Sequence, residues 1–273
     1  MPWRLPVDGY VLAIVATVAL AFVLPCPAEA LSVLGLVAQG SIALLFFLYG
    51  AKLAPRAVWQ GLMHWRLQVL VLAATFILFP LLGLAAGVLV PGILSPELYV
   101  GLLFLCLVPS TVQSSIIFTG LAGGNVAAAV SATSASSLIG MVVTPLLAAL
   151  LIGTRAEVSV SSLEGVLLQL QLPFLLGQAM RPWIAPSVER HRRAVGLVDR
   201  LAVLLIVYMA VSAAAGRGIW QTVRPLDLLA VLLADMVLLA LVLGIMAAVS
   251  RRLGLSRPDE IVVVFCGGNK GLV

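Results

Sequence analysis

Continuous apolar runs of about twenty residues constrain this chain more than any other feature. A helix of that length crosses the hydrocarbon core of a bilayer, which is about 30 Å thick. Strands of a membrane barrel would instead alternate apolar and polar residues over about ten positions, and the runs here do not alternate. Only 10% of the 273 residues are charged, far fewer than in soluble domains. The sequence therefore predicts an all-α, polytopic transmembrane helical bundle whose surrounding partner is the lipid bilayer.

Polar or Pro/Gly-rich breaks divide the chain into nine predicted spans. One of these breaks is Arg181 to Arg193, which we expect to be a loop. The spans are approximately 9–25, 31–51, 67–90, 97–120, 125–152, 160–180, 199–216, 226–250 and 259 to the end.

The basic residues lie mostly between the spans, on one predicted side of the membrane. Twelve of the 16 Lys and Arg residues share the side of the N-terminus, three lie on the other side, and Lys270 falls inside the last span. The positive-inside rule then places the N-terminus in the cytoplasm and the chain in a bacterial-type inner membrane. Because the basic residues form no soluble face, the net charge of +5 predicts no nucleic-acid partner.

The first helix resembles a signal peptide. Arg4 precedes an apolar stretch, and Ala28 to Ala30 imitates a small-residue cleavage site. Cleavage stays an alternative, but we favour an uncleaved anchor, because multispan proteins commonly retain the first helix.

Polar groups interrupt the fourth span near its middle. Proline removes a backbone donor and clashes with the preceding helical turn. Opened backbone at membrane depth is tolerated only where it is buried in protein or lines a cavity. A proline kink closed by hydroxyl groups would account equally well for this pattern. The candidate binding residues here are Pro109, Ser110, Thr111, Gln113, Ser114 and Ser115.

The ninth span contains a second interruption with a buried cation. Glycines make a poor helix interior, and an ammonium near the bilayer midplane costs several kcal/mol unless it is paired or hydrated. We therefore favour a functional role for this segment. Its candidate binding residues are Gly267, Gly268, Asn269 and Lys270.

Two further features lie at the same predicted depth. Asp235 is the only carboxylate deep in a span, and we hypothesise that it pairs with Lys270 or shares a water network with it. Separate partners for each charge are the alternative. In the fifth span, Thr133 and Ser137 begin a stripe of small and hydroxylated residues that continues through Gly140 and Thr144. Such a stripe suits close helix packing as well as a binding site.

The two interruptions predict an internal repeat. Interrupted helices at corresponding places of two halves point to the central site of a transporter. Pro109 and Gly267 are 158 positions apart, which divides the chain into a first repeat at about 9–152 and a second, incomplete repeat at about 160–273. An odd unit of five spans must be inverted when it is repeated, so we expect ten spans, of which this chain ends within the ninth.

At these segments the sequence resembles the bile acid/sodium symporter superfamily, specifically its SBF-like branch. The residues that carry the resemblance are Phe47 to Gly50, Leu107 to Asn125, the Ser/Thr-rich fifth span and Phe265 to Lys270. The resemblance implies a single membrane domain, 1–273, with a panel at 9–51 and 160–216 and a core at 67–152 and 226–273. The broken spans four and nine would cross in that core.

The resemblance also implies a function. A secondary transporter would move a small organic solute, expected to be an anion, and expose it alternately to each side of the membrane. We expect no cofactor other than a coupling ion, for which sodium is the candidate. By resemblance, Ser114, Ser115 and Thr133 would supply hydroxyl oxygens to one sodium.

A second sodium site of the family is not preserved. Its acid and glutamine in span nine are replaced by Val264 or Phe265 and then Gly268, and its third-span glutamine matches Thr75. We hypothesise that the Lys270 ammonium stands in for that cation. Coupling to one sodium, to a proton or to no ion stays open.

Three other functions compete with a carrier. A membrane-embedded enzyme acting on a lipid-linked substrate would need a metal cluster or an activated nucleophile, and the sequence contains no such motif, so we expect no enzyme. A channel is the second alternative. Because Val273 follows Lys270 by three residues, a truncated fragment that does not transport is the third. Substrate identity and oligomeric state do not follow from the sequence.

Overall fold

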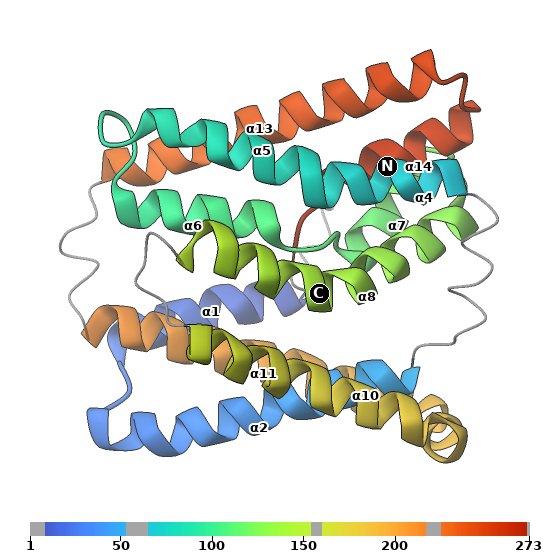
Figure 1. Cartoon of the computed structure of the whole chain (residues 1–273). Helices are drawn as coiled ribbons and strands as arrows, with labels where there is room; N and C mark the ends of the chain where they lie inside the picture. Colours follow the sequence, from blue (N-terminus) through green and yellow to red (C-terminus); the bar gives the residue numbers. More distant parts are fainter. Residues whose placement is uncertain (1–8, 53–64, 154–159, 217–224, 272–273) are drawn as a thin grey trace, which may run out of the picture. The chain divides into compact units, whose positions relative to one another are not determined.

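The computed structural model describes residues 9–52, 65–153, 160–216 and 225–271. Every regular element among these residues is a helix, as the predicted fold class requires (Figure 1). The chain divides into two compact units, one formed within residues 1–53 and 169–224 and the other within 54–168 and 225–273. Each unit is described separately below.

The part of the first unit that the structure describes consists of four helices. Glycines let two of them approach closely: a Cβ atom on Gly50 would collide with the carbonyl oxygen of Phe174, and one on Gly177 would collide with that of Phe47. Side chains also join helices in this unit, because the Tyr49 hydroxyl donates to Asp199 Oδ1 at 2.7 Å. The helices are α1 (Gly9–Val23), α2 (Ala28–Lys52), most of α10 (Val160–Arg190) and α11 (Arg192–Gly216).

The second unit contains the interrupted spans. Its third predicted span is a continuous run of helix with changes of register, made of α4 (Trp65–Ala73), the π-helix η2 (Ala74–Leu78), α5 (Phe79–Ala85) and the 3-10 helix η3 (Ala86–Leu89). The remaining elements are α6 (Pro96–Leu107), α7 (Val112–Leu121), α8 (Val126–Leu151), α13 (Pro225–Arg252) and α14 (Arg257–Gly268).

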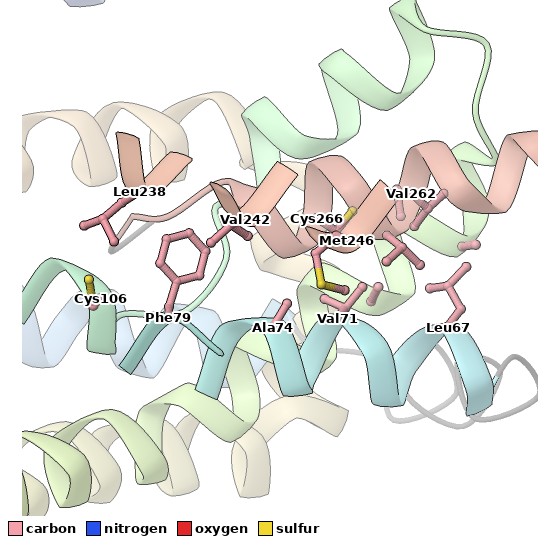
Figure 2. Close-up of a cluster of buried hydrophobic side chains, with 14 of the residues drawn as sticks. Leu67, Val71, Ala74, Phe79, Cys106, Leu238, Val242, Met246, Val262 and Cys266 are labelled. Atoms are coloured by element: carbon pink, nitrogen blue, oxygen red, sulfur yellow. The ribbon is translucent and has the colours of Figure 1, made fainter. Parts of the chain in front are cut away.

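An apolar core holds these elements together. Figure 2 shows Val71 of α4 near Met246 of α13 and Leu67 of α4 on the side of Val262 of α14, while Val242 of α13 lies beside Phe79. Phe79 and Cys106 extend the same cluster toward the break in the fourth span. The core therefore fixes the third span against α13 and α14, which brings the two interrupted segments to the same part of the unit.

Membrane-spanning character is clear for most of the predicted spans. Five described helices, or continuous runs of helix, are long and apolar enough to cross a bilayer, and the bent pair α6–α7 makes a sixth. Helix α1 is apolar but shorter, and neither residues 171–190 of α10 nor helix α14 is among these helices. The chain is thus a polytopic helical membrane protein, and the count of nine spans stays a prediction.

The prediction of a loop from Arg181 to Arg193 is wrong. Helix α10 continues through Arg190, His191 forms a single turn residue, and α11 begins at Arg192. Polarity marks where a segment leaves the apolar layer, but it does not end helical hydrogen bonding, because Arg and Glu are good helix formers. The predicted breaks within 53–64, 154–159 and 217–224 lie outside the described residues.

Candidate functional site at two broken helices

The fourth span breaks at Pro109, as the sequence predicts. Helix α6 ends at Leu107, and Val108 (φ −73°, ψ 154°) and Thr111 (φ −66°, ψ 133°) are extended. Helix α7 then begins at Val112, bent by 66° from α6. Proline cannot donate to the preceding turn and disfavours helical geometry in the residue before it, so the chain leaves the helix where Val108 precedes Pro109.

The ninth span breaks at its glycines and meets the first break. Helix α14 ends at Gly268, and Asn269 is extended (φ −80°, ψ 129°). The amide of Gly271 donates to the carbonyl oxygen of Pro109 at 3.2 Å. In Figure 1 the red chain that follows α14 passes the green gap between α6 and α7. The two interrupted stretches therefore lie in direct contact within the second unit.

The glycines of α14 are required by close packing. A Cβ atom on Gly268 would lie 2.6 Å from Leu243 Cδ2 on α13, and one on Gly267 would lie 3.1 Å from Ala74 Cβ on η2. Both positions are buried. Small residues at these positions let α14 approach both neighbours and carry Lys270 to the break.

The π-helix leaves the carbonyl group of Thr75 without a helical donor. In an α-helix its partner would be the amide of Phe79, but that amide donates to Ala74 instead. The π-helical partner would be residue 80, which is Pro80 and has no N–H group. The register change and the proline together free this buried carbonyl.

The break in the fourth span frees two more carbonyl groups. The helical donor for Cys106 would be the amide of Ser110, which donates to Ser136 Oγ at 3.2 Å instead. Val108 is extended and lies beyond the end of α6. The carbonyl oxygen of Leu107, between these two residues, accepts from Thr144 Oγ1 at 2.8 Å.

Lys270 binds all three freed carbonyl oxygens. Its Nζ atom donates to Thr75 O at 2.8 Å, to Cys106 O at 3.3 Å and to Val108 O at 2.8 Å. An ammonium has three N–H donors, so each finds an acceptor. The ammonium also lies 4.4 Å from the ring centroid of Phe79, within cation–π distance. The three carbonyl groups are neutral, so they solvate an ammonium without cancelling its charge.

Hydroxyl groups connect the break to α8 and α14. Ser115 Oγ donates to the carbonyl oxygen of Phe265 at 3.4 Å and lies 3.4 Å from Ser110 Oγ. Thr111 Oγ1 is hydrogen-bonded to Ser114 Oγ. These contacts place the four predicted hydroxyl residues of the fourth span in two hydrogen-bonded pairs, one of which also reaches α14.

Other predicted site residues lie outside these hydrogen-bonded pairs. Thr133 is buried and its hydroxyl donates to Ala129 O on its own helix at 2.8 Å. Gln113 is exposed, and Ser137 is half-buried on α8. Asn269 is half-buried at the crossing, and its Nδ2 atom has no hydrogen-bond partner.

Asp235 is not paired with Lys270 in this structure. It lies on α13 one turn before Leu238 and two turns before Val242, both buried in the core, so it shares the face of α13 that packs into the unit. Within the described parts of the chain, no ion pair joins its carboxylate to the ammonium. The ammonium donates to carbonyl oxygens and not to the carboxylate that the pairing hypothesis named.

The sodium site expected from resemblance stays a prediction. Ser114 and Ser115 lie near each other on α7, but no hydrogen bond of the described residues joins either to Thr133. Hard cations prefer several oxygen ligands, commonly including a carboxylate. The described residues contain no group of three or more His, Cys, Asp or Glu side chains that could hold a metal ion together.

Four residues outside the predicted set of binding residues reach the site, although Thr144 had been placed in the stripe of the fifth span and Thr75 matched to the third-span glutamine of the family. The backbone of Thr75, the ring of Phe79 and the hydroxyls of Ser136 and Thr144 all contact the crossing. Pro80 in the middle of the third span was the available signal, because a proline at membrane depth demands a new partner for a carbonyl group.

A groove of about 590 Å³ lies elsewhere in the second unit, between α5–η3 and α13. Leucine, alanine, valine and isoleucine side chains line it throughout, among them Leu82, Leu89, Leu233 and Leu241. It contains none of the polar groups of the crossing. We therefore assign the candidate site to the crossing and not to this groove.

Comparison with known proteins gives a consistent result. The SBF-like CPA transporter family model matches residues 8–273. The chain is 48% identical over 267 residues to "Uncharacterized protein PA2026" of Pseudomonas aeruginosa and 42% identical over 266 residues to "Putative symporter YfeH" of Escherichia coli; each match covers 97% of this chain and 80% of the relative. It is 27% identical over 239 residues to "Sodium/bile acid cotransporter 7" of Danio rerio, which covers 85% of this chain and 70% of the relative.

Proposed function

Because the chain belongs to the SBF-like CPA transporter family, we propose that it is a secondary active transporter that moves a small organic anion by alternating access. The solute would bind beside the crossing of the two broken helices and be exposed in turn to each side of the bilayer. We place the protein in a bacterial-type inner membrane with its N-terminus in the cytoplasm, on the distribution of its basic residues.

The observation that carries the proposal is the charge balance of the crossing. In its ammonium form Lys270 carries a positive charge that its three neutral carbonyl ligands do not cancel. Among the described residues no carboxylate forms an ion pair with it. A charge in a low-dielectric interior interacts far more strongly with an opposite charge than it does in water. An anionic solute would supply the missing negative charge.

Hydrogen-bond donors beside the crossing support the same class of solute. Thr111 is the N-cap of α7 but makes no capping hydrogen bond, so the first amides of α7 stay available. Free amides and the positive end of the helix dipole favour anions. Asn269 Nδ2 offers a further donor without a partner. Carboxylate or phosphate oxygens would satisfy all of these groups.

The coupling ion is proposed from the chemistry of the same segment. We propose that Lys270 replaces one cation permanently, so at most one sodium is cotransported, held by hydroxyl oxygens of Ser114, Ser115 and Thr133. Thr133 Oγ1 donates its proton to Ala129 O, which leaves the lone pairs of the hydroxyl oxygen for a cation. A proton carried by Asp235 and Lys270, or transport without any ion, are the other coupling schemes.

A ligand screen on the purified protein tests the proposal. Thermal unfolding would be followed with a library of organic anions, cations and neutral solutes, with and without sodium, for the parent chain and for Lys270→Met. We expect the stabilising compounds to be anions, to raise Tm of the parent by a few degrees at saturating concentration, and to lose this effect in the variant. Stabilisation by cations or neutral solutes alone, or equal stabilisation of the variant, would overturn the proposal.

A further inference from the structure

The three carbonyl oxygens around Lys270 exist independently of the lysine. Thr75 O is freed by the π-register and Pro80, while Cys106 O and Val108 O are freed by Pro109 and by the diversion of the Ser110 amide to Ser136. None of these causes involves residue 270. A chain without the lysine would therefore present the same three acceptors at the same place.

The geometry points to a built monovalent-cation site. We propose that Thr75 O, Cys106 O and Val108 O, with the ring of Phe79, form an ammonium-selective cation site that the protein fills with its own side chain. Removing the side chain beyond Cβ would open the site to a free alkylammonium ion. Every later statement about the site concerns this carbonyl cage, defined by those three oxygens and that ring.

The distances from the three carbonyl oxygens to Nζ favour an ammonium ion over sodium in this site. The oxygens lie 2.8, 3.3 and 2.8 Å from Nζ, which is the range of N–H···O hydrogen bonds. A hard metal cation takes more oxygen ligands at clearly shorter distances, as Ca²⁺ does at about 2.3–2.6 Å. The Phe79 ring, 4.4 Å from Nζ, adds an aromatic face that favours ammonium groups. The cage therefore prefers a cation with N–H donors to bare sodium.

The parent protein gains a fixed cation from this arrangement. A tethered ammonium need not be taken up from solution, so the cage does not consume a coupling ion. It also joins the third span, the break after α6 and the end of α14 through three hydrogen bonds at one atom. Loss of the cation leaves three carbonyl groups without a donor, each of which is costly in a membrane.

The test is chemical rescue of Lys270→Ala in detergent. The side chain that this variant lacks corresponds to n-propylammonium, so thermal unfolding would be measured with n-propylammonium, methylammonium, sodium or tetramethylammonium chloride at equal ionic strength. We expect Tm of the variant to lie about 5 °C or more below that of the parent in tetramethylammonium. The two alkylammonium ions should recover at least about half of this loss, and sodium should recover less.

Two matched variants control the experiment. Lys52→Ala removes the other lysine of the chain and should respond to no ion. In Lys270→Met the methionine side chain fills the space that the lysine side chain occupies. This variant should therefore be destabilised, and alkylammonium ions should not raise its Tm. Equal effects of methylammonium and tetramethylammonium, rescue of Lys270→Met to the same extent, or a variant as stable as the parent would each overturn the inference.

Recovery of folded protein is the second readout. If Lys270→Ala unfolds during purification, membranes would be solubilised in n-propylammonium or in tetramethylammonium chloride and the monodisperse fraction compared. The inference expects a severalfold larger fraction with n-propylammonium, and an equal or absent fraction in both salts contradicts it. The inference concerns the site of the proposed function but is tested through stability, so it can fail while anion binding succeeds, and the reverse.

Discussion

At the scale of single residues, prolines and a lysine explain the crossing together. Pro80 removes a donor that Thr75 O would otherwise have, the break at Pro109 frees Cys106 O and Val108 O, and the ammonium of Lys270 donates to all three at 2.8–3.3 Å. Neither element is stable alone at membrane depth, because opened carbonyl groups and an isolated charge are both costly there. Together the carbonyl groups gain a donor and the ammonium gains acceptors, which explains why a charged residue is tolerated in the middle of an apolar segment.

Pro80 and Lys270 should be energetically coupled. Replacing Pro80 with alanine supplies a new amide that can donate to Thr75 O, so this carbonyl no longer depends on the lysine. We expect Lys270→Ala to cost on the order of 1 kcal/mol less in the Pro80→Ala background than in the parent. A double-mutant cycle of free energies of unfolding measures the difference. Strict additivity of the two substitutions would show that the freed carbonyl has no such role.

The hydroxyl of Thr144 should stabilise the break in the fourth span. It is the donor to Leu107 O at 2.8 Å in a buried environment, and Thr144→Val removes it with little change in shape. The free energy of unfolding should fall by about 1–3 kcal/mol, because the carbonyl keeps no donor. Ser41→Ala is the control, since Ser41 is hydrogen-bonded to its own helix at an exposed position, and it should change stability little. Equal effects of the two substitutions would contradict the assignment.

At the scale of helices, close approach of backbones determines where glycine is needed. Gly50 on α2 faces the backbone of α10 at Phe174 and Gln178, whereas a Cβ atom added to Gly40 on the same helix would meet no neighbouring atom within 4 Å. Gly50→Ala should therefore lower the free energy of unfolding by about 1–3 kcal/mol. Gly40→Ala should be neutral or stabilising by up to about 1 kcal/mol. Thermal unfolding in detergent compares them, and a harmless Gly50→Ala would mean that α2 and α10 are not packed this closely.

The helices and both breaks could be predicted from the sequence, but the partners of the breaks could not. Apolar run length predicted where the described helices lie, except that α10 and α11 extend through the predicted loop, and Pro109 and the glycines at 267–268 marked the interruptions. For Lys270 the sequence left two alternatives, a pair with Asp235 or separate partners for each charge, because a sequence shows charged side chains but not which backbone groups are free. The actual partners are backbone carbonyls, and which carbonyl is free depends on the register of η2, a tertiary effect of Pro80 and packing against α14.

Helix ends at polar segments were the other limit. The stretch after Arg181 is polar and contains Pro182 and Pro186, yet α10 passes through it. Sequence polarity reports the depth of a residue in the bilayer, whereas the end of a helix depends on local hydrogen bonding. The inverted relation of the two repeats and the roles of panel and core stay predictions.

At the scale of the whole molecule, a fixed positive charge limits the coupling ratio. If Lys270 occupies the place of one cation, solute uptake should rise with sodium concentration to at most the first power. Initial rates in proteoliposomes at constant ionic strength, with sodium replaced by choline, give this exponent. Uptake that rises with the square of the sodium concentration would mean that two sodium ions bind and that the lysine replaces neither.

The most direct test of the account is solute counterflow in proteoliposomes. Vesicles loaded with the anion that stabilises the purified protein would be diluted into a trace of the same anion carrying a label, and the parent, Lys270→Met and Lys52→Met would be compared. A carrier with its binding site at the crossing predicts transient accumulation of label for the parent and for Lys52→Met, and a reduction of at least about tenfold for Lys270→Met. No accumulation by the parent, or full accumulation by Lys270→Met, would contradict the central claim.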